Sequence, residues 1–300
     1  MIDKETIQSA FKSIQDDIVR QLLEVDTKAE LKEDLWKRDG GGGGRTRIIQ
    51  KGKIIEKGGV NFSAVHGDLP APLCKEFKIE SGQFFATGVS IVIHPHNPHV
   101  PIIHMNIRYF ELSDGTYWFG GGIDLTPHYV VKEDAGFFHE ALQRVCDRHH
   151  PEFYNEFKKW ADQYFYIPHR QETRGVGGIF FDKLKENEHL TKKQCFDFVC
   201  DVGNTFAPVY TTLMQKHGDV SYTEEEKQWQ LLRRGRYVEF NLVYDRGTKF
   251  GLQTNGRIES ILMSLPKTAG WEYDFTPEEG SKEAATLKLL RKGVNWVGEI

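Results

Sequence analysis

Of two successive stretches of the chain, residues 102–112 alternate apolar and polar residues with a period of two, and residues 84–93 are largely apolar, with Ser90 between Val89 and Ile91. Such alternation is typical of β-strands, because successive side chains of a strand point to opposite faces of the sheet. The second stretch ends at Ser-Asp-Gly (residues 113–115), and another strand-like run follows at residues 116–119. An Asp-Gly pair between two such runs is a strong hairpin signal, so we expect adjacent antiparallel strands here.

Helical patterns lie apart from these strands. Apolar residues recur every three or four positions near the N-terminus,. Strand-like runs at residues 237–244 and 250–254, on either side of Asp-Arg-Gly, predict a second hairpin,. Because strands group in hairpins and helices group together, without βαβ alternation, we expect an α+β fold with a large, mainly antiparallel sheet. Further helices are predicted at residues 134–149, 151–166, 191–217, 223–232 and 277–292.

We expect one domain, residues 1–300, with residues 1–38 as an N-terminal helical arm, because no linker, repeat or composition shift divides the chain,. The 39 Lys and Arg residues against 43 Asp and Glu give a net charge of −4, which argues against a nucleic-acid-binding protein,. No apolar stretch is long enough to span a bilayer,. The four cysteines form no CxxC pair, and the first residues resemble neither a signal nor a transit peptide, so we expect a cytoplasmic protein,.

Polar residues of the two stretches fall on one face if the strands are neighbours. The first stretch contributes Ser90 and then His94, and the second contributes His104, Asn106 and Arg108. A solvated sheet face is the alternative, but such faces usually carry Thr, Lys and Glu. Imidazoles exchange protons near neutral pH, and a guanidinium binds a carboxylate through two hydrogen bonds. The pattern therefore predicts a site for an anionic substrate that exchanges protons.

Glycine-rich segments flank this predicted face. Residues 120–122 are three glycines that follow a strand-like run but lack the spacing of nucleotide-binding loops,. We interpret them as allowing close approach to a flat ligand, with Asp124 beside it; a turn or cap role is the alternative for Asp124. Arg257 follows Asn255 and Gly256 on a permissive turn, and a surface position is the alternative reading for this arginine,.

Seven long motifs occur in order between the glycine run and the last predicted helix, and together they resemble the oxygen-dependent coproporphyrinogen III oxidases. They are GGGGRTR (41–47), EKGGVN (56–61), HMNIRYF (104–110), WFGGGIDLTP (118–127), YFY (164–166), RGVGGIFFD (174–182) and ESILMSLP (259–266).

The resemblance implies an enzyme of haem biosynthesis that converts two propionates of coproporphyrinogen III to vinyl groups, giving protoporphyrinogen IX with release of carbon dioxide and hydrogen peroxide. Dioxygen would be the electron acceptor, and no flavin, haem or nicotinamide would be required. It also implies a flat sheet sandwiched between helical layers, and a homodimer.

The resemblance further implies roles for individual residues. His104 would be the proton donor, and Arg108 and Asp124 would act in catalysis. Arg108 and Arg257 would hold propionates, and Asp124 would accept hydrogen bonds from pyrrole N–H groups. Substrate contacts are expected at Ser90, Asn106, Ile107, Arg108, Asn255, Gly256 and Arg257.

A divalent metal is a further alternative within the resemblance. Some bacterial members of the family are assigned one at histidines that match His94, His104, His139 and His169, whereas metal-independent members keep the same four. From the residues alone, prolines interrupt the segment that contains His94, and no HExxH spacing occurs,. Two rival functions stay open: a non-catalytic tetrapyrrole-binding protein, and a metal-dependent oxidase or hydrolase that uses these histidines.

Overall fold

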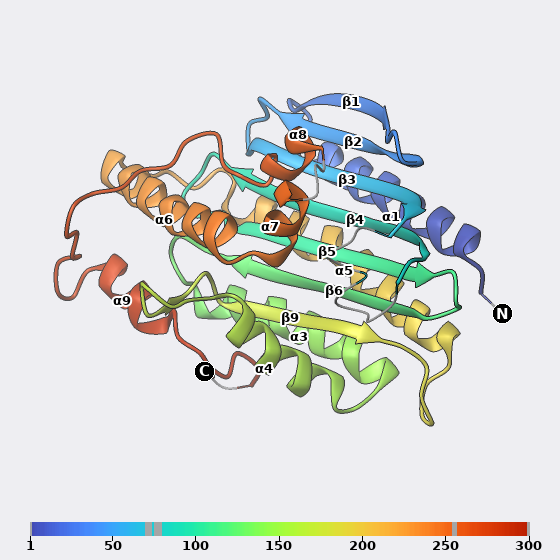
Figure 1. Ribbon diagram of the computed structural model, residues 1–300. Helices are drawn as coiled ribbons and strands as arrows, with labels where there is room; N and C mark the ends of the chain where they lie inside the picture. Colours follow the sequence, from blue (N-terminus) through green and yellow to red (C-terminus); the bar gives the residue numbers. More distant parts are fainter. Residues whose placement is uncertain (1, 70–73, 75–79, 254–256, 299–300) are drawn as a thin grey trace.

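A seven-stranded antiparallel sheet, in the order β1-β2-β3-β4-β5-β6-β9, forms the centre of the computed structural model, which describes residues 2–69, 74, 80–253 and 257–298 (Figure 1). Each strand pairs with its neighbours in an antiparallel register. The strands are β1 (Glu30–Lys37), β2 (Gly42–Gln50), β3 (Ile55–Asp68), β4 (Gln83–Pro95), β5 (Ile102–Leu112), β6 (Tyr117–Thr126) and β9 (Gly177–Leu184); β7 (Tyr166–Ile167) and β8 (Glu172–Thr173) form a small separate pair.

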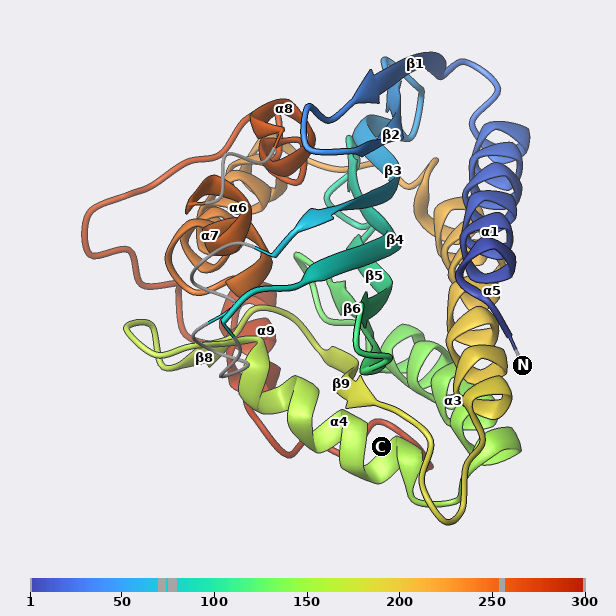
Figure 2. The same ribbon diagram turned by 45° about the vertical axis from the view of Figure 1, so that its right-hand side comes forward.

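Helices cover both faces of the sheet (Figure 2). One layer contains α1 (Lys4–Val25), α3 (Lys132–His149) and α5 (Lys192–His217). The other contains α6 (Glu224–Val243), α7 (Arg246–Gln253) and α8 (Ile258–Leu262). Beyond these layers, α4 (Phe153–Tyr164) packs against β9, and α9 (Lys282–Leu289) comes near the end of the chain. The predicted α+β class, with a mainly antiparallel sheet between helical layers, is confirmed.

The alternation predicted for β4 and β5 is confirmed by burial. Val89 and Ile91 of β4 and Met105 and Ile107 of β5 are buried in the main core, on the side of α1 and α5. Because side chains of a strand alternate, their polar neighbours face α6–α8 instead. The predicted Asp-Gly hairpin between β5 and β6 also forms, with Gly115 at φ +87°.

The second predicted hairpin, over residues 237–254, is wrong. Residues up to Val243 continue α6, and α7 begins at Arg246. The aromatic residues Tyr237, Phe240 and Tyr244 fit a helical spacing as well as a strand, and in the structure they pack on the inner side of α6. The Asp-Arg-Gly segment begins a helix instead of a turn between strands: Arg246 and Gly247 are the first residues of α7, and the Asp245 carboxylate accepts a hydrogen bond from the Thr248 backbone N–H (2.7 Å),.

The ends of the sheet also differ from the expectation. Of the predicted N-terminal helical arm, residues 4–25 are helical, whereas residues 30–37 form the edge strand β1. At the opposite edge, β9 was not predicted as a strand, although it lies in one of the long motifs. The last helix covers residues 282–289 and is shorter than the predicted 277–292.

Candidate active site

The polar face of the sheet continues across several strands beneath α8. Ser90 of β4 pairs with Asn106 of β5 on one side and with Asn61 of β3 on the other. The Asn61 side-chain amide donates to the carbonyl of Ser260 in α8 (3.2 Å). Thr46 of β2 lies next to Asn61 and contacts the Ser260 hydroxyl (3.0 Å). The helices of this layer are thus attached to the sheet by polar contacts, beside the strands that carry the predicted site.

His104, Asp124 and Arg174 form a cluster on this face, toward the β9 edge of the sheet, in which Asp124 and Arg174 are buried and His104 is partly exposed. His104 of β5 and Asp124 of β6 are directly paired, and Nδ1 of His104 is 2.8 Å from Oδ1 of Asp124. Arg174 lies just before β9; its Nη2 donates to Oδ1 (2.7 Å) and its Nε to Oδ2 (3.1 Å) of the same carboxylate. Both carboxylate oxygens therefore have protein donors.

Aromatic rings enclose the Arg174 guanidinium, whose side chain is only 2% exposed. The rings of Phe165, Tyr237 and Phe240 lie 4.5, 4.7 and 4.6 Å from its central carbon. Its Nη1 donates to Oδ1 of Asn241 in α6 (2.9 Å). The cost of removing the Arg174 guanidinium from water is thus offset by its contacts with an anion, an amide oxygen and the faces of aromatic rings.

Asp124 is ionised in this environment. Burial by itself would raise the pKa of the carboxyl, but the Arg174 charge and the hydrogen bond from His104 outweigh burial and lower the pKa below its ordinary value,. A carboxylate can only accept hydrogen bonds, so Nδ1 of His104 must carry the proton. The arrangement fixes one tautomer and leaves Nε2 for proton exchange.

A second polar group lies further along the same face of the sheet, with Arg108 four residues from His104 on β5. Arg108 of β5 donates from Nη1 to Oδ1 of Asn106 (3.0 Å), and its Nη2 is 2.9 Å from Oδ1 of Asp182 in β9. Arg108 is about one-third exposed, unlike Arg174. The neighbouring position on β6 is Gly120, which has no side chain to separate the two charged groups. Arg108 is therefore a cation that a ligand can reach.

The structure brings some of the predicted substrate residues together and separates others. Ser90, Asn106 and Arg108 share the polar face with the buried cluster. The Ile107 side chain is fully buried on the opposite face, because it alternates with Asn106 and Arg108, so the substrate contact predicted at this residue stays a prediction and would involve its backbone,. Arg257 pairs with Asp34 on the edge strand β1. Residues 255 and 256, the predicted Asn and Gly contacts, lie outside the described residues.

The four histidines of the alternative metal centre do not come together. Nε2 of His94 is 2.8 Å from the Ser264 carbonyl, and burial lowers the His94 pKa to about 3. His139 lies in α3, across the sheet, where its ring nitrogens contact the hydroxyl of Tyr154 and the carbonyl of Val176.

Nor does His169 approach them. Its ring contacts Glu239 and Tyr244, each at 2.7 Å. Across the described parts of the chain, no three His, Cys, Asp or Glu side chains gather as a metal would require. The donor set therefore does not fit the metal centre that the resemblance offered as an alternative.

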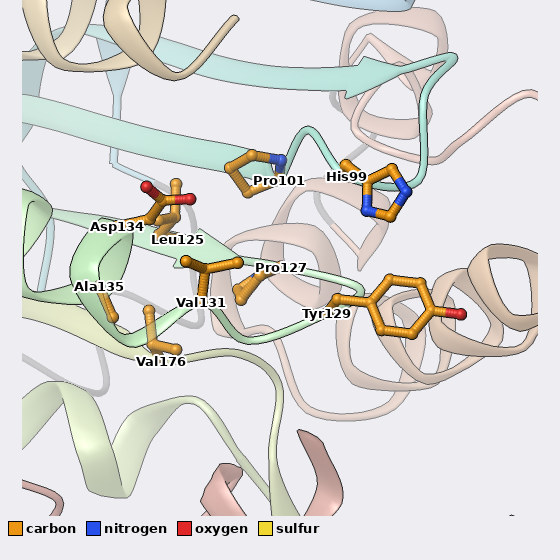
Figure 3. A pocket seen from close by; sticks show the side chains of 9 residues that line it. All are labelled: His99, Pro101, Leu125, Pro127, Tyr129, Val131, Asp134, Ala135 and Val176. Atoms are coloured by element: carbon orange, nitrogen blue, oxygen red, sulfur yellow. The ribbon is translucent and has the colours of Figure 1, made fainter. Parts of the chain in front are cut away.

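A small hollow lies away from the polar face, between the segments that precede β5 and follow β6 (Figure 3). Its lining is largely apolar, and no predicted substrate residue contributes to it. It is lined by His99, Pro101, Leu125, Pro127, Tyr129, Val131, Asp134, Ala135 and Val176.

The sequence analysis did not single out Arg174, Asn241 or Asp182. Arg174 and Asp182 are the first and last residues of one long motif, so the motif was the available signal. Asn241 lies within the segment wrongly predicted as a strand, where no local pattern marks it.

Comparison with known proteins identifies relatives along nearly the whole chain. Residues 6–296 match the family model described as coproporphyrinogen III oxidase. The mitochondrial oxygen-dependent coproporphyrinogen-III oxidase of Rattus norvegicus is 50% identical over 308 residues, covering 98% of this chain and 69% of the rat protein. The mitochondrial Homo sapiens protein of the same name is 52% identical, with 93% and 64% covered. The Drosophila melanogaster oxygen-dependent coproporphyrinogen-III oxidase is 47% identical, with 98% and 80% covered.

Proposed function

The chain belongs to the coproporphyrinogen III oxidase family, and from this premise we propose that it catalyses the oxygen-dependent conversion of coproporphyrinogen III to protoporphyrinogen IX in haem biosynthesis. The observation that carries the proposal is the polar sheet face, where a proton-exchanging histidine and an accessible arginine lie on the same side of β5,. Both groups belong to motifs shared with the family.

The chemistry of the reaction defines what this face must do. Each propionate loses carbon dioxide, one proton and two electrons as it becomes a vinyl group. Dioxygen takes up two electrons and two protons to become hydrogen peroxide, so each propionate consumes one proton overall. A site for this reaction needs cations for carboxylates and a group that exchanges protons.

His104 is the proton-exchanging group of the proposal. Asp124 and Arg174 hold its ring, so that Nε2 is the free nitrogen. The role predicted for Asp124, accepting pyrrole N–H groups, stays a prediction; in this structure its oxygens already accept from Arg174 and His104. We assign Asp124 first to the orientation of His104.

Arg108 and Arg257 are the proposed carboxylate-binding groups. Arg108 stands on β5, whereas the Arg257 side chain reaches β1, four strand spacings away, or about 19 Å at ~4.8 Å per strand,. A tetrapyrrole carries acidic side chains around its rim, so widely separated cations suit it. Gly88 on β4 and Gly120 on β6 flank Arg108 in its row of the sheet, so no side chain rises beside it from the neighbouring strands.

Oxygen dependence is the first property to test. We propose dioxygen as the electron acceptor, with no organic cofactor and no metal. Aerobic turnover of coproporphyrinogen III is expected to give protoporphyrin after oxidation of the product, and to survive a strong chelator. Anaerobic turnover should fall to background. Turnover lost to the chelator and restored by one metal would favour the metal-dependent oxidase, and no turnover under any condition would favour the binding-protein alternative.

We also propose a homodimer. Apolar side chains are exposed at Leu31 and Leu35 of β1, the edge strand of the sheet, and at Leu242 and Val243 at the end of α6. Strand edges with exposed apolar residues are common interaction surfaces. Sedimentation is expected to give twice the 34.6 kDa chain mass, and Leu35→Lys should shift the equilibrium toward the monomer. A wild-type species of one chain mass at micromolar concentration would contradict the proposal.

The location in the cell stays a prediction. The rat and human relatives are named as mitochondrial, and a 46% identical relative from Glycine max as chloroplastic. We propose the cytoplasm, as the sequence analysis predicted; fractionation of the producing cells tests this. In the described residues, no helix combines the length and apolarity that crossing a membrane requires.

A further inference from the structure

A β-bulge shapes the end of β9 beside the proposed site. Gly121 of β6 pairs with Phe181, but Phe119 pairs with Leu184, so two residues of β9 stand opposite Gly120 alone. Lys183, the second of them, has a left-handed backbone with φ +53°. Phe181 and Leu184 can therefore both pack toward the core, while Asp182 faces the polar side. Bulges of this kind commonly redirect a side chain next to an active site.

The absence of a side chain at Gly120 leaves room for the contact between Arg108 and Asp182. Arg108 is on β5 and Asp182 on β9, so their side chains meet above β6, the strand between them. A Cβ atom at Gly120 would lie 2.7 Å from both Nη2 of Arg108 and Oδ1 of Asp182. The backbone of Gly120 is not left-handed, so this ion pair, and not strain, is what a side chain there would disturb.

Two contacts together fix the plane of the Arg108 guanidinium. Nη2 faces Asp182 at 2.9 Å, and Nη1 donates to Asn106 at 3.0 Å. Oδ1 of Asp182 also accepts the backbone N–H of Lys183 (2.9 Å), which holds the carboxylate itself in place. A guanidinium has five N–H groups, so three remain beyond these two contacts for an incoming carboxylate.

We propose that Asp182 is a positioning residue that orients Arg108 toward the reacting propionate, an inference that rests on the proposed function. The pair is about one-third exposed, and ion pairs of this kind contribute little to folding,. A bulge, a left-handed lysine and a glycine nevertheless combine to form it. That combination is better explained by a need to orient the Arg108 side chain than by a need to stabilise the fold.

Two independent variants test the inference by steady-state kinetics under air. Asp182→Asn removes the anion, and Gly120→Ala inserts a methyl group between the partners. Each is expected to lower kcat about 10- to 100-fold through misplacement of Arg108, with a smaller change in KM. Because both act through one ion pair, the double variant should be no slower than the worse single variant. Glu188→Gln, at an exposed carboxylate after β9, is the control and should match wild type.

The outcomes separate this inference from the proposed function. Wild-type kcat in Asp182→Asn, with the melting temperature unchanged, would overturn the role of Asp182 and leave the oxidase intact. A lower KM with unchanged kcat would also overturn it, because Asp182 would then merely compete with the substrate carboxylate. Absence of turnover in the wild type would instead refute the proposed function. Multiplying effects in the double variant would show that the two residues act separately, against the inference.

Discussion

An Arg174→Met variant is expected to lose about 3–5 kcal/mol of unfolding free energy at neutral pH, because it leaves a buried carboxylate without its counter-charge. Asp124 is 1% exposed, and Arg174 donates to both of its oxygens. Methionine keeps much of the apolar contact with the surrounding aromatic rings but supplies no donor. Urea denaturation followed by tryptophan fluorescence measures the loss.

The loss of stability in Arg174→Met should depend on pH, and the pKa of Asp124 sets the direction of this dependence. In the wild type the pKa of Asp124 is lowered in the folded state, so its stabilisation is present above the ordinary carboxyl pKa and is lost as pH falls through the folded pKa,. In the variant, unopposed burial raises the pKa, and the folded state takes up a proton more readily. The unfolding free energy that Arg174→Met loses relative to the wild type should therefore become smaller from pH 8 toward pH 5.

Two comparisons make the stability experiment specific. Arg170→Met removes a more exposed arginine, which pairs with Glu239, and is expected to cost about 0–1 kcal/mol,. The double variant Asp124→Asn/Arg174→Met removes both charges and should recover part of the loss. A loss of unfolding free energy that is independent of pH, or no larger than that of Arg170→Met, would contradict the conclusion that the Asp124–Arg174 ion pair stabilises the fold.

The polar face was predictable because its signal is local. Burial of one strand face forces alternation, so the order of residues in β5 places His104, Asn106 and Arg108 on one side without any knowledge of the partners,. The same rule placed the Ile107 side chain on the core side, where the structure has it.

Other features depend on contacts between distant residues. Arg174 lies 50 positions from Asp124, and only the pairing of β6 with β9 brings them together. The segment 237–244 fits a strand or a helix equally well by its aromatic residues, and packing against the sheet decides between them. Likewise, the spacing of the four histidines cannot show that α3 places His139 across the sheet from His104.

A His104→Gln variant is expected to slow turnover by about 100- to 10,000-fold, the range typical for loss of a general acid or base. The glutamine amide can still donate to Asp124, so the charged cluster should persist, but an amide does not exchange protons near neutral pH,. The measurement pairs kcat with anaerobic binding of coproporphyrinogen III, which should be unchanged. His189→Gln, at an exposed histidine, is the matched control.

Coupling between the two halves of the reaction gives the last test of His104. If it supplies the proton that dioxygen needs, oxygen uptake and carbon dioxide release should fall together in His104→Gln, because the two electrons released on decarboxylation are the ones that dioxygen takes up. Normal turnover would end the proton role outright. Weakened anaerobic binding with an unchanged kcat would instead make His104 a substrate contact, and the hydrogen bond that His104 donates to Asp124 would then serve to orient the ring toward the substrate rather than to select a tautomer.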